Sequence, residues 1–206
     1  MGGKMMKGEK GIVPGHHILA GISFGWRFRR QLADIERFTT VDHSLLALDP
    51  LELKKTGIEA LALDFDGVLA PHGAPVPLPE IVEWLEKCAD IFGGNRLFIL
   101  SNKPTEARRS WFAEHFPGVC FIAGVRKKPY PDGLNKTGEL AGVPLSAILM
   151  VDDRLLTGCL AALNAGSIPC YIRKPFIRFS QNTISEIFFW LLRHVERILV
   201  RMFGNT

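Results

Sequence analysis

Two aspartates separated by one residue close an apolar run in the first third of the chain. The run EALALDF covers residues 59–65, and Asp66 and Gly67 follow it directly. A short apolar run of this kind is typical of a buried strand, and the carboxylates of Asp64 and Asp66 leave its end on the same side. One carboxylate can attack a phosphorus atom while the other transfers protons, with an aspartyl-phosphate as the intermediate. Gly67 allows the chain to turn away sharply.

Two further polar groups follow later apolar runs. Ser101 and Asn102 come after RLFIL, and their side chains can donate hydrogen bonds to phosphoryl oxygens. Lys128 lies in the segment VRKKP, where it directly precedes a proline. Its ammonium can neutralise both a phosphoryl group and the carboxylate that attacks it. We choose Lys128 over Lys127 because of that proline.

A second carboxylate pair, Asp152 and Asp153, follows the apolar run AILMV. Carboxylate oxygens are the hard ligands that Mg2+ prefers, so this pair can complete a metal site with Asp64 and Asp66. Each motif alone has an ordinary explanation as a solvated turn, a helix cap or a chance Lys-Pro pair. Their order and their common position at strand ends favour a single site, because the carboxyl ends of parallel strands converge.

The elements that must position these groups alternate between strand and helix patterns. This alternation predicts a three-layer, Rossmann-like α/β fold: a mostly parallel sheet with helices on both faces. About 35 residues separate Asp66 from Ser101, and about 26 separate Asn102 from Lys128, so neither gap holds a large cap domain. We expect strands over 59–65, 96–100, 119–123, 147–151 and 168–172, and helices over 51–55, 78–92, 104–116, 131–141 and 154–165.

The chain divides into three expected parts. Residues 1–40 form a tail and an amphipathic segment, residues 41–180 form the phosphatase core, and residues 181–206 form an amphipathic helix. The helix has a broad apolar face and carries Arg193, Arg197 and Arg201 on another. Two interpretations stay open for both terminal segments: packing on the core, or lying on an anionic membrane.

The four motifs together resemble those of the haloacid dehalogenase superfamily over about residues 58–175. The resemblance implies that Asp64 is the nucleophile and Asp66 the general acid and base, with its main-chain carbonyl also contacting Mg2+. It implies that Ser101 and Lys128 hold the phosphoryl group. Asp153 would be the metal ligand of the fourth motif, with Asp152 as a second contributor. A second aspartate two residues after the nucleophile favours phosphatases over dehalogenases.

A narrower resemblance is to the subclass III phosphatases of the phosphatidylglycerophosphate phosphatase type. It rests on residues 41–58, Lys128-Pro129, residues 155–157, Asn164 and the basic apolar tail. The chain departs from that group in having Gly67-Val68 for Asn-Thr, Asp152 for Gly and Gly158 for Asp.

We therefore expect a Mg2+-dependent phosphomonoesterase that acts on phosphatidylglycerophosphate or a similar bulky phosphomonoester. The alternatives are a phosphatase for a sugar phosphate, nucleotide or phosphoprotein, and a non-catalytic interaction module of the same fold.

Composition sets the remaining limits. The chain has 206 residues, a formal net charge of +4 and no long basic run, so we expect no nucleic-acid partner. Its four cysteines lack the spacing of metal ligands and are expected to be reduced. The N-terminus has no apolar secretory region, and no stretch of sequence is apolar enough to span a membrane. We expect a cytoplasmic protein, with peripheral membrane contact left open.

Overall fold

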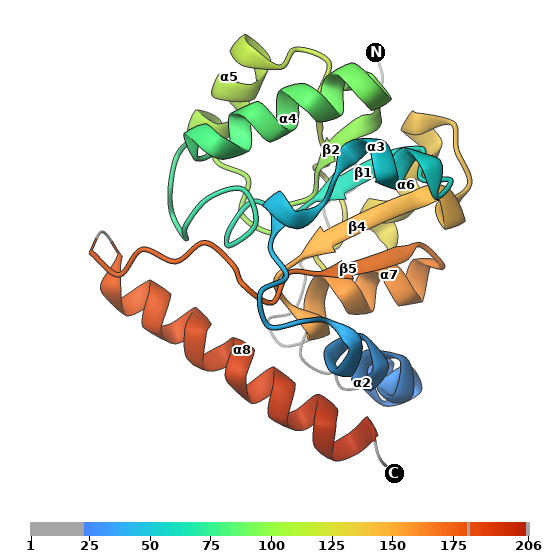
Figure 1. Ribbon diagram of the computed structural model, residues 1–206, viewed down its shortest axis with the longest axis vertical. Coiled ribbons are helices and arrows are strands. Elements are labelled where there is room, and N and C mark those ends of the chain that lie inside the picture. Colours follow the sequence, from blue (N-terminus) through green and yellow to red (C-terminus); the bar gives the residue numbers. More distant parts are fainter. Residues whose placement is uncertain (1–22, 181, 205–206) are drawn as a thin grey trace, which may run out of the picture.

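The computed structural model describes residues 23–180 and 182–204. Its centre is a five-stranded sheet in the order β3-β2-β1-β4-β5 (Figure 1). Every pair of neighbouring strands is parallel. The strands are β1 (Ala60–Leu63), β2 (Leu97–Ile99), β3 (Cys120–Phe121), β4 (Ile148–Asp152) and β5 (Ile168–Tyr171).

Strand β1 is buried on both faces because helices cover both sides of the sheet. Leu61 and Leu63 pack in one core with helices α3 (Pro50–Lys55), α4 (Pro79–Phe92) and α5 (Glu106–His115). Ala60 and Ala62 point into a second core, formed with helices α6 (Asp132–Ala141) and α7 (Leu160–Ala165). A strand that is apolar on both faces suits the centre of a parallel sheet that is covered on both sides. The predicted three-layer α/β fold is confirmed.

Local signals define both ends of helix α3. Helix α3 begins after Asp49, whose Oδ1 accepts a hydrogen bond from the backbone N–H of Leu51 at 2.8 Å. The chain leaves this helix at Gly57, which has a φ of 90°. Short 3₁₀ turns, at Leu45–Ala47, Gly94–Arg96 and Leu145–Ala147, precede α3, β2 and β4.

Two predicted boundaries are wrong in ways that affect the site. Strand β4 extends to Asp152, so this residue ends the strand and Asp153 is the first to leave it. The helix predicted over 154–165 is two elements, a π-helical turn η4 (Leu155–Cys159) followed by α7. A π-helical turn is wider than an α-helical one and often occurs at functional sites.

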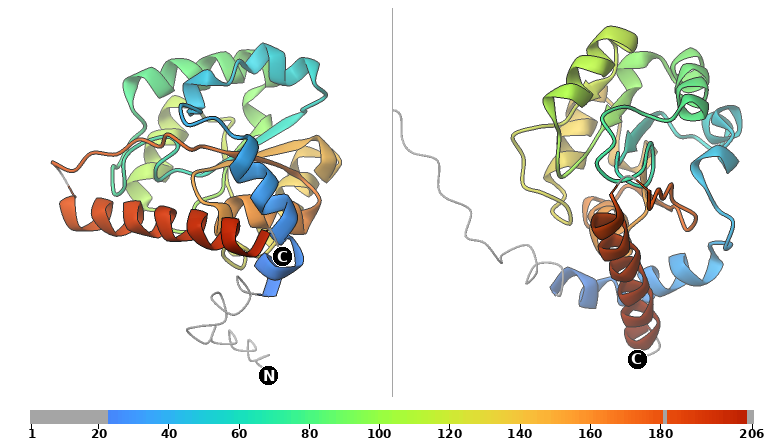
Figure 2. Two further views of the ribbon diagram at one scale, coloured as in Figure 1. Left: turned by 60° about the horizontal axis from the view of Figure 1, so that its bottom comes forward. Right: turned by 90° about the vertical axis from the view of Figure 1, so that its left-hand side faces the viewer.

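Two helices lie outside the sheet layers. Helix α2 (Arg29–Phe38) and helix α8 (Thr183–Gly204) pack against each other, and both contact η4 (Figures 1 and 2). Leu32 of α2 and Val200 of α8 are buried in a third core with Leu160 and Tyr171. Between β1 and β2 the chain forms a loop and α4, so no cap domain is inserted there. Within the described ranges, no helix is both long and apolar enough to span a membrane.

Candidate active site

A pocket of about 400 Å³ opens where β1 and β4 end. Asp64 follows β1 directly, and its backbone N–H donates to the carbonyl of Val151 in β4 at 2.9 Å. The predicted residues Asp64, Asp66, Ser101, Asn102, Lys128 and Asp153 all line this pocket. Asp152 is fully buried beneath it. The fold therefore brings together residues that are up to 89 positions apart in the sequence (Asp64 to Asp153).

Lys128 is the central cation of the pocket and is almost fully buried. Its Nζ lies 3.0 Å from Oδ1 of Asp64 and 2.5 Å from Oδ2 of Asp152. Burial by itself lowers the pKa of this ammonium, but the two carboxylates outweigh burial and raise the pKa above its usual range. Lys128 is thus a permanent positive charge beside the proposed nucleophile. Lys127 is exposed, as expected.

Three carboxylates cluster around that charge. Oxygens of Asp64, Asp152 and Asp153 lie within 4.8 Å of one another. Burial raises the pKa of Asp64 to about 7, with Lys128 opposing and the neighbouring carboxylates adding to the rise. Burial raises the pKa of Asp153 to about 6, although the Arg193 guanidinium opposes it. The three carboxylates repel one another, and a divalent cation bound between them would relieve that repulsion. Their oxygens are the hard ligands that Mg2+ prefers.

Asp152 is less available to a metal than Asp153. Its carboxylate accepts hydrogen bonds from Lys128, from the backbone N–H of Arg154 at 2.8 Å and from Oγ1 of Thr157 at 3.4 Å. These donors engage both of its oxygens. Within residues 23–180 and 182–204, in contrast, Asp153 accepts hydrogen bonds only on Oδ2, from the guanidinium of Arg193 at 2.5 Å. We therefore regard Asp153, together with Asp64, as the principal candidate for metal binding.

Asp66 is held by an arginine that the sequence did not single out. The guanidinium of Arg108, from α5, contacts both carboxylate oxygens of Asp66, at 2.6 and 3.0 Å. The backbone N–H of Gly73 donates to the same carboxylate at 3.0 Å. Burial alone would raise the pKa of Asp66, but the Arg108 contacts outweigh it and lower the pKa. Asp66 is therefore an ionised carboxylate in this arrangement.

Ser101 and Asn102 both lie at the pocket wall after β2. Oγ of Ser101 accepts a hydrogen bond from the backbone N–H of Lys103 at 3.2 Å. No described residue accepts the hydroxyl hydrogen of Ser101, which can therefore be donated to a ligand. Oδ1 of Asn102 accepts a hydrogen bond from the backbone N–H of Lys128 at 3.1 Å. Asn102 thus holds the loop that carries Lys128, a positioning role that the sequence did not suggest.

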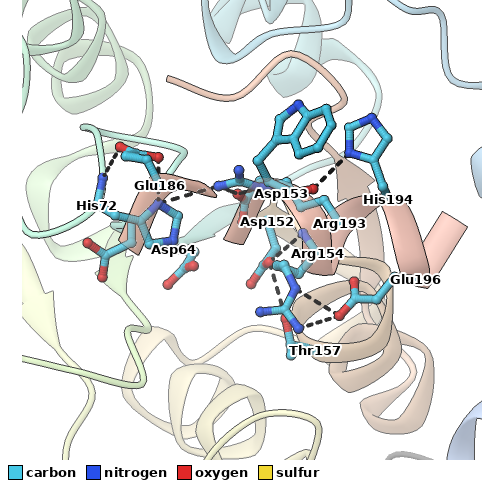
Figure 3. Close-up of polar contacts among 12 residues, drawn as sticks. Asp64, His72, Asp152, Asp153, Arg154, Thr157, Glu186, Arg193, His194 and Glu196 are labelled. Atoms are coloured by element: carbon cyan, nitrogen blue, oxygen red, sulfur yellow. Dashed lines mark hydrogen bonds and ion pairs between the residues drawn. The ribbon is translucent and has the colours of Figure 1, made fainter. Parts of the chain in front are cut away.

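Helix α8 contributes buried charges to the same region (Figure 3). Arg193 binds Asp153, and Glu196 accepts a hydrogen bond from Nε of Arg154 at 2.8 Å. Glu186 accepts a hydrogen bond from the backbone N–H of His72 at 3.0 Å. The sequence pattern left open whether this helix packs on the core or lies on a membrane, and it did not identify these contacts.

His72 joins this network as a neutral imidazole. Its Nδ1 lies 3.4 Å from a guanidinium nitrogen of Arg193, which can only donate, and its ring stacks on Phe189 with 3.9 Å between centroids. Burial and the nearby Arg193 lower the pKa of His72 to about 4, with Asp66 opposing. Glu186 lies 3.6 Å from the same Nδ1, but this pair is charged only if the imidazole takes up a proton.

Gly67 is required where the chain turns out of the site. It has a φ of 84°, a backbone conformation that side-chain-bearing residues rarely adopt. A Cβ at this position would also overlap the carboxylate of Asp153. The motif glycine therefore serves both the turn and the close approach of the two carboxylate-bearing segments.

Comparison with known proteins agrees with this geometry. A family model described as haloacid dehalogenase-like hydrolase matches residues 17–166. The chain belongs to the haloacid dehalogenase-like hydrolase family. This membership confirms the broader of the two resemblances seen in the sequence.

Individual matches are more distant. The chain is 26% identical over 141 residues to the sodium/potassium-transporting ATPase subunit alpha-4 of Rattus norvegicus. That match covers 66% of this chain and 12% of the ATPase subunit, so the chain spans only a small part of that relative. The crystal structure of an uncharacterized protein from Corynebacterium glutamicum has a TM-score of 0.43 and 20% identity, and the match covers 65% of this chain and 95% of that one.

Proposed function

We propose that this haloacid dehalogenase-like hydrolase cleaves phosphomonoesters through an aspartyl-phosphate formed on Asp64. The contact between Lys128 and Asp64 carries the proposal. A buried, permanently charged ammonium 3.0 Å from the Asp64 carboxylate favours its ionised form, against the effect of burial, and can also attract the phosphoryl group. Haloacid dehalogenase-like membership supports hydrolysis, and the pair Asp64 and Asp66 supports phosphate as the group attacked.

In the first step, a carboxylate oxygen of Asp64 attacks phosphorus. A bond forms between that oxygen and phosphorus as the bond from phosphorus to the ester oxygen breaks, and the departing alkoxide takes up a proton. Lys128 and the hydroxyl of Ser101 face the charge that builds on the phosphoryl oxygens. Asp66 can donate the proton only after it acquires one and leaves Arg108, because its contacts with Arg108 favour the ionised form.

In the second step, water attacks the phosphorus of the aspartyl-phosphate. Asp66 accepts a proton from that water, inorganic phosphate departs, and the carboxylate of Asp64 is regenerated. The ionised Asp66 is well suited to this step. The contacts with Arg108 therefore favour Asp66 as a base. For Asp66 to act as an acid these contacts would have to break, which requires α5 and the loop that follows Asp66 to move apart.

Mg2+ is the proposed cofactor, with Asp64 and Asp153 as its side-chain ligands. When bound, it would shield the negative charge of the substrate from the attacking carboxylate. Asp152 would act mainly by holding Lys128. Arg193 engages Oδ2 of Asp153, so this arginine sets how much of the carboxylate is available to the cation.

Phosphatidylglycerophosphate is the proposed substrate. The proposal rests on the resemblance of residues 41–58 and Lys128-Pro129 to phosphatases of the phosphatidylglycerophosphate phosphatase type. No inserted cap domain lies over the pocket among the described residues, which suits a bulky ester. A soluble phosphomonoester, such as a sugar phosphate or nucleotide, is the rival.

The test is phosphate release from phosphatidylglycerophosphate in mixed micelles, beside a panel of soluble esters, with and without Mg2+. A strong preference for the lipid supports the substrate proposal, and activity confined to soluble esters refutes it. No activity on any ester would favour the non-catalytic interaction module.

A further inference from the structure

Helix α8 is oriented with its charged side inward. Its buried residues are Glu186, Arg193, Glu196 and Val200, and the three charged ones contact the core. A helix on the surface of a globular protein normally has the reverse arrangement, with apolar residues inward and charged residues in water. Buried ion pairs and hydrogen bonds therefore hold α8 at Glu186, Arg193 and Glu196, whereas its end packs on α2 through the apolar Val200.

The opposite side of α8 is an exposed apolar stripe. At 100° per residue, its members fall within an arc of about 100°, and the helix is roughly 33 Å long. Ile184 is 87% exposed, and Met202, near the other end, is 62% exposed. An apolar surface of this length marks an interaction site. The stripe comprises Ile184, Ile187, Phe188, Leu191, Val195, Ile198 and Met202.

The charges beside the stripe favour an anionic partner. The two acidic residues of α8 are both buried, so among the helix's exposed side chains none is acidic. Arg197 and Arg201 lie to one side of the stripe by helical position; the guanidinium of Arg201 is paired with the buried carboxylate of Glu36 at 2.6 Å, while its side chain stays 57% exposed. A second copy of the chain would bring like charges together along such a seam, which disfavours self-association.

Residues at the start of the described chain extend this surface. Trp26 is 56% exposed, and its ring packs edge-on against Phe203 at the end of α8, with 6.1 Å between centroids. The guanidinium of Arg29 lies 4.7 Å from the centroid of the Trp26 ring, and Arg27 and Arg30 carry further charge in the same segment. A tryptophan beside several arginines is typical of surfaces that bind the headgroup region of anionic bilayers.

The other end of the stripe meets the active-site pocket. Ser185 and Phe189 line that pocket. A shallower depression beside it is lined by Ile184, Phe188 and Lys103. Figure 2 shows α8 along the margin of the molecule, outside the layers of the sheet. A bilayer in contact with the stripe would therefore lie next to the opening above Asp64.

We propose that the stripe on α8, extended by Trp26, is a docking surface for an anionic lipid bilayer. This inference deepens the proposed function, because the docked bilayer would present a lipid phosphomonoester to the pocket. The buried ion pairs Arg193–Asp153 and Arg154–Glu196 then have a structural purpose: they anchor α8 through its polar side and leave the apolar side free for lipid.

The experiment is co-sedimentation of the full chain with vesicles of phosphatidylcholine, with or without phosphatidylglycerol. The test variant carries Ile187→Ser, Leu191→Ser and Ile198→Ser. Its matched control carries Leu46→Ser, Leu51→Ser and Leu140→Ser, three similarly exposed residues elsewhere on the surface. We expect the wild type and the control to bind anionic vesicles, more weakly at high salt, and the stripe variant to bind at least about tenfold more weakly.

Loss of binding in the control to the same extent, or absence of vesicle binding in the wild type, would overturn the proposal. So would a wild-type dimer by light scattering that the stripe variant converts to a monomer. Hydrolysis of p-nitrophenyl phosphate, measured in parallel, separates the two proposals. Vesicle binding without any hydrolysis contradicts the catalytic proposal and leaves the docking surface supported, whereas hydrolysis without binding does the reverse.

Discussion

The carboxylate of Asp152 occupies the space into which a side chain at position 158 would project. A Cβ atom on Gly158 would overlap Oδ2, Cγ and Cβ of Asp152. The carboxylate has little freedom to move away, because Lys128, Thr157 and the backbone of Arg154 all donate to it. Position 158 must therefore stay glycine as long as position 152 carries an aspartate.

Replacing Gly158 by alanine should destabilise the protein by about 1–3 kcal/mol, the usual cost of overpacking a filled interior. In an Asp152→Gly background the same change should cost much less, because the overlapping atoms are gone. Chemical denaturation of both single variants and the double variant measures this coupling. Gly25→Ala is the control, since a Cβ there would meet, among the described residues, only Cδ2 of Leu156 at an ordinary contact distance of 3.7 Å. If the changes in unfolding free energy of Gly158→Ala and Asp152→Gly simply added in the double variant, the proposed overlap between the two side chains would be wrong.

Arg108 should control the protonation of Asp66. In Arg108→Gln the pKa of Asp66 should rise, because the guanidinium that favours its ionised form is removed. The basic limb of the pH profile of kcat/KM, which reports the step in which Asp66 donates a proton, should then move to higher pH. Arg109→Gln, on the exposed side of the same helix, should leave the profile in place. An unmoved limb in an Arg108→Gln protein of normal stability would rule out this role.

His72 should make the fold less stable in acid. Its pKa is about 4 in the folded protein and near 6.5 in an unfolded chain, so the unfolded state binds the proton first as pH falls. The contribution is complete above about pH 6.5 and decreases towards pH 4, by roughly 3 kcal/mol at most.

His72→Gln should lack this part of the decline when unfolding free energies at pH 7 and pH 4.5 are compared. His115→Gln, at an exposed position, should decline as the wild type does. The same decline in all three proteins would mean that His72 does not take up a proton in this range.

Removing the cation that faces Asp153 should be costly. Arg193→Met would leave a buried carboxylate without its partner, and we expect a loss of about 3–5 kcal/mol in the free energy of unfolding. Millimolar Mg2+ should restore part of the loss, because a cation at Asp153 replaces the missing positive charge. Arg197→Met should be nearly neutral. Thermal melts with and without Mg2+ provide the comparison, and a variant as stable as the wild type would contradict the ion pair's role.

The strands and the motif residues at their ends could be predicted because both are local signals. Each apolar run was short and ended in polar residues, and parallel strands bring such ends together. Arg108 and His72 could not be found in this way. Arg108 lies on a largely polar helix, and His72 lies in an irregular loop, so neither has a periodic pattern that marks it as buried.

The orientation of α8 could not be predicted from the sequence pattern either. Helical periodicity identifies an apolar side but does not say whether that side faces the core or the surroundings. One signal was available: Glu186, Arg193 and Glu196 recur on a single side, opposite the apolar residues. Charges of both signs on one side indicate ion pairs, but their partners, Asp153 and Arg154, are defined only by the fold.

The most direct test of the proposed chemistry is the rate of phosphate release by wild type and Asp64→Asn at saturating Mg2+, for two proteins shown to have the same melting temperature. Asparagine keeps the shape of the side chain but removes the nucleophilic oxygen. We predict that turnover falls by at least about a thousandfold and that no phosphorylated protein is trapped after acid quenching. Near-normal turnover in Asp64→Asn would contradict covalent catalysis at this residue.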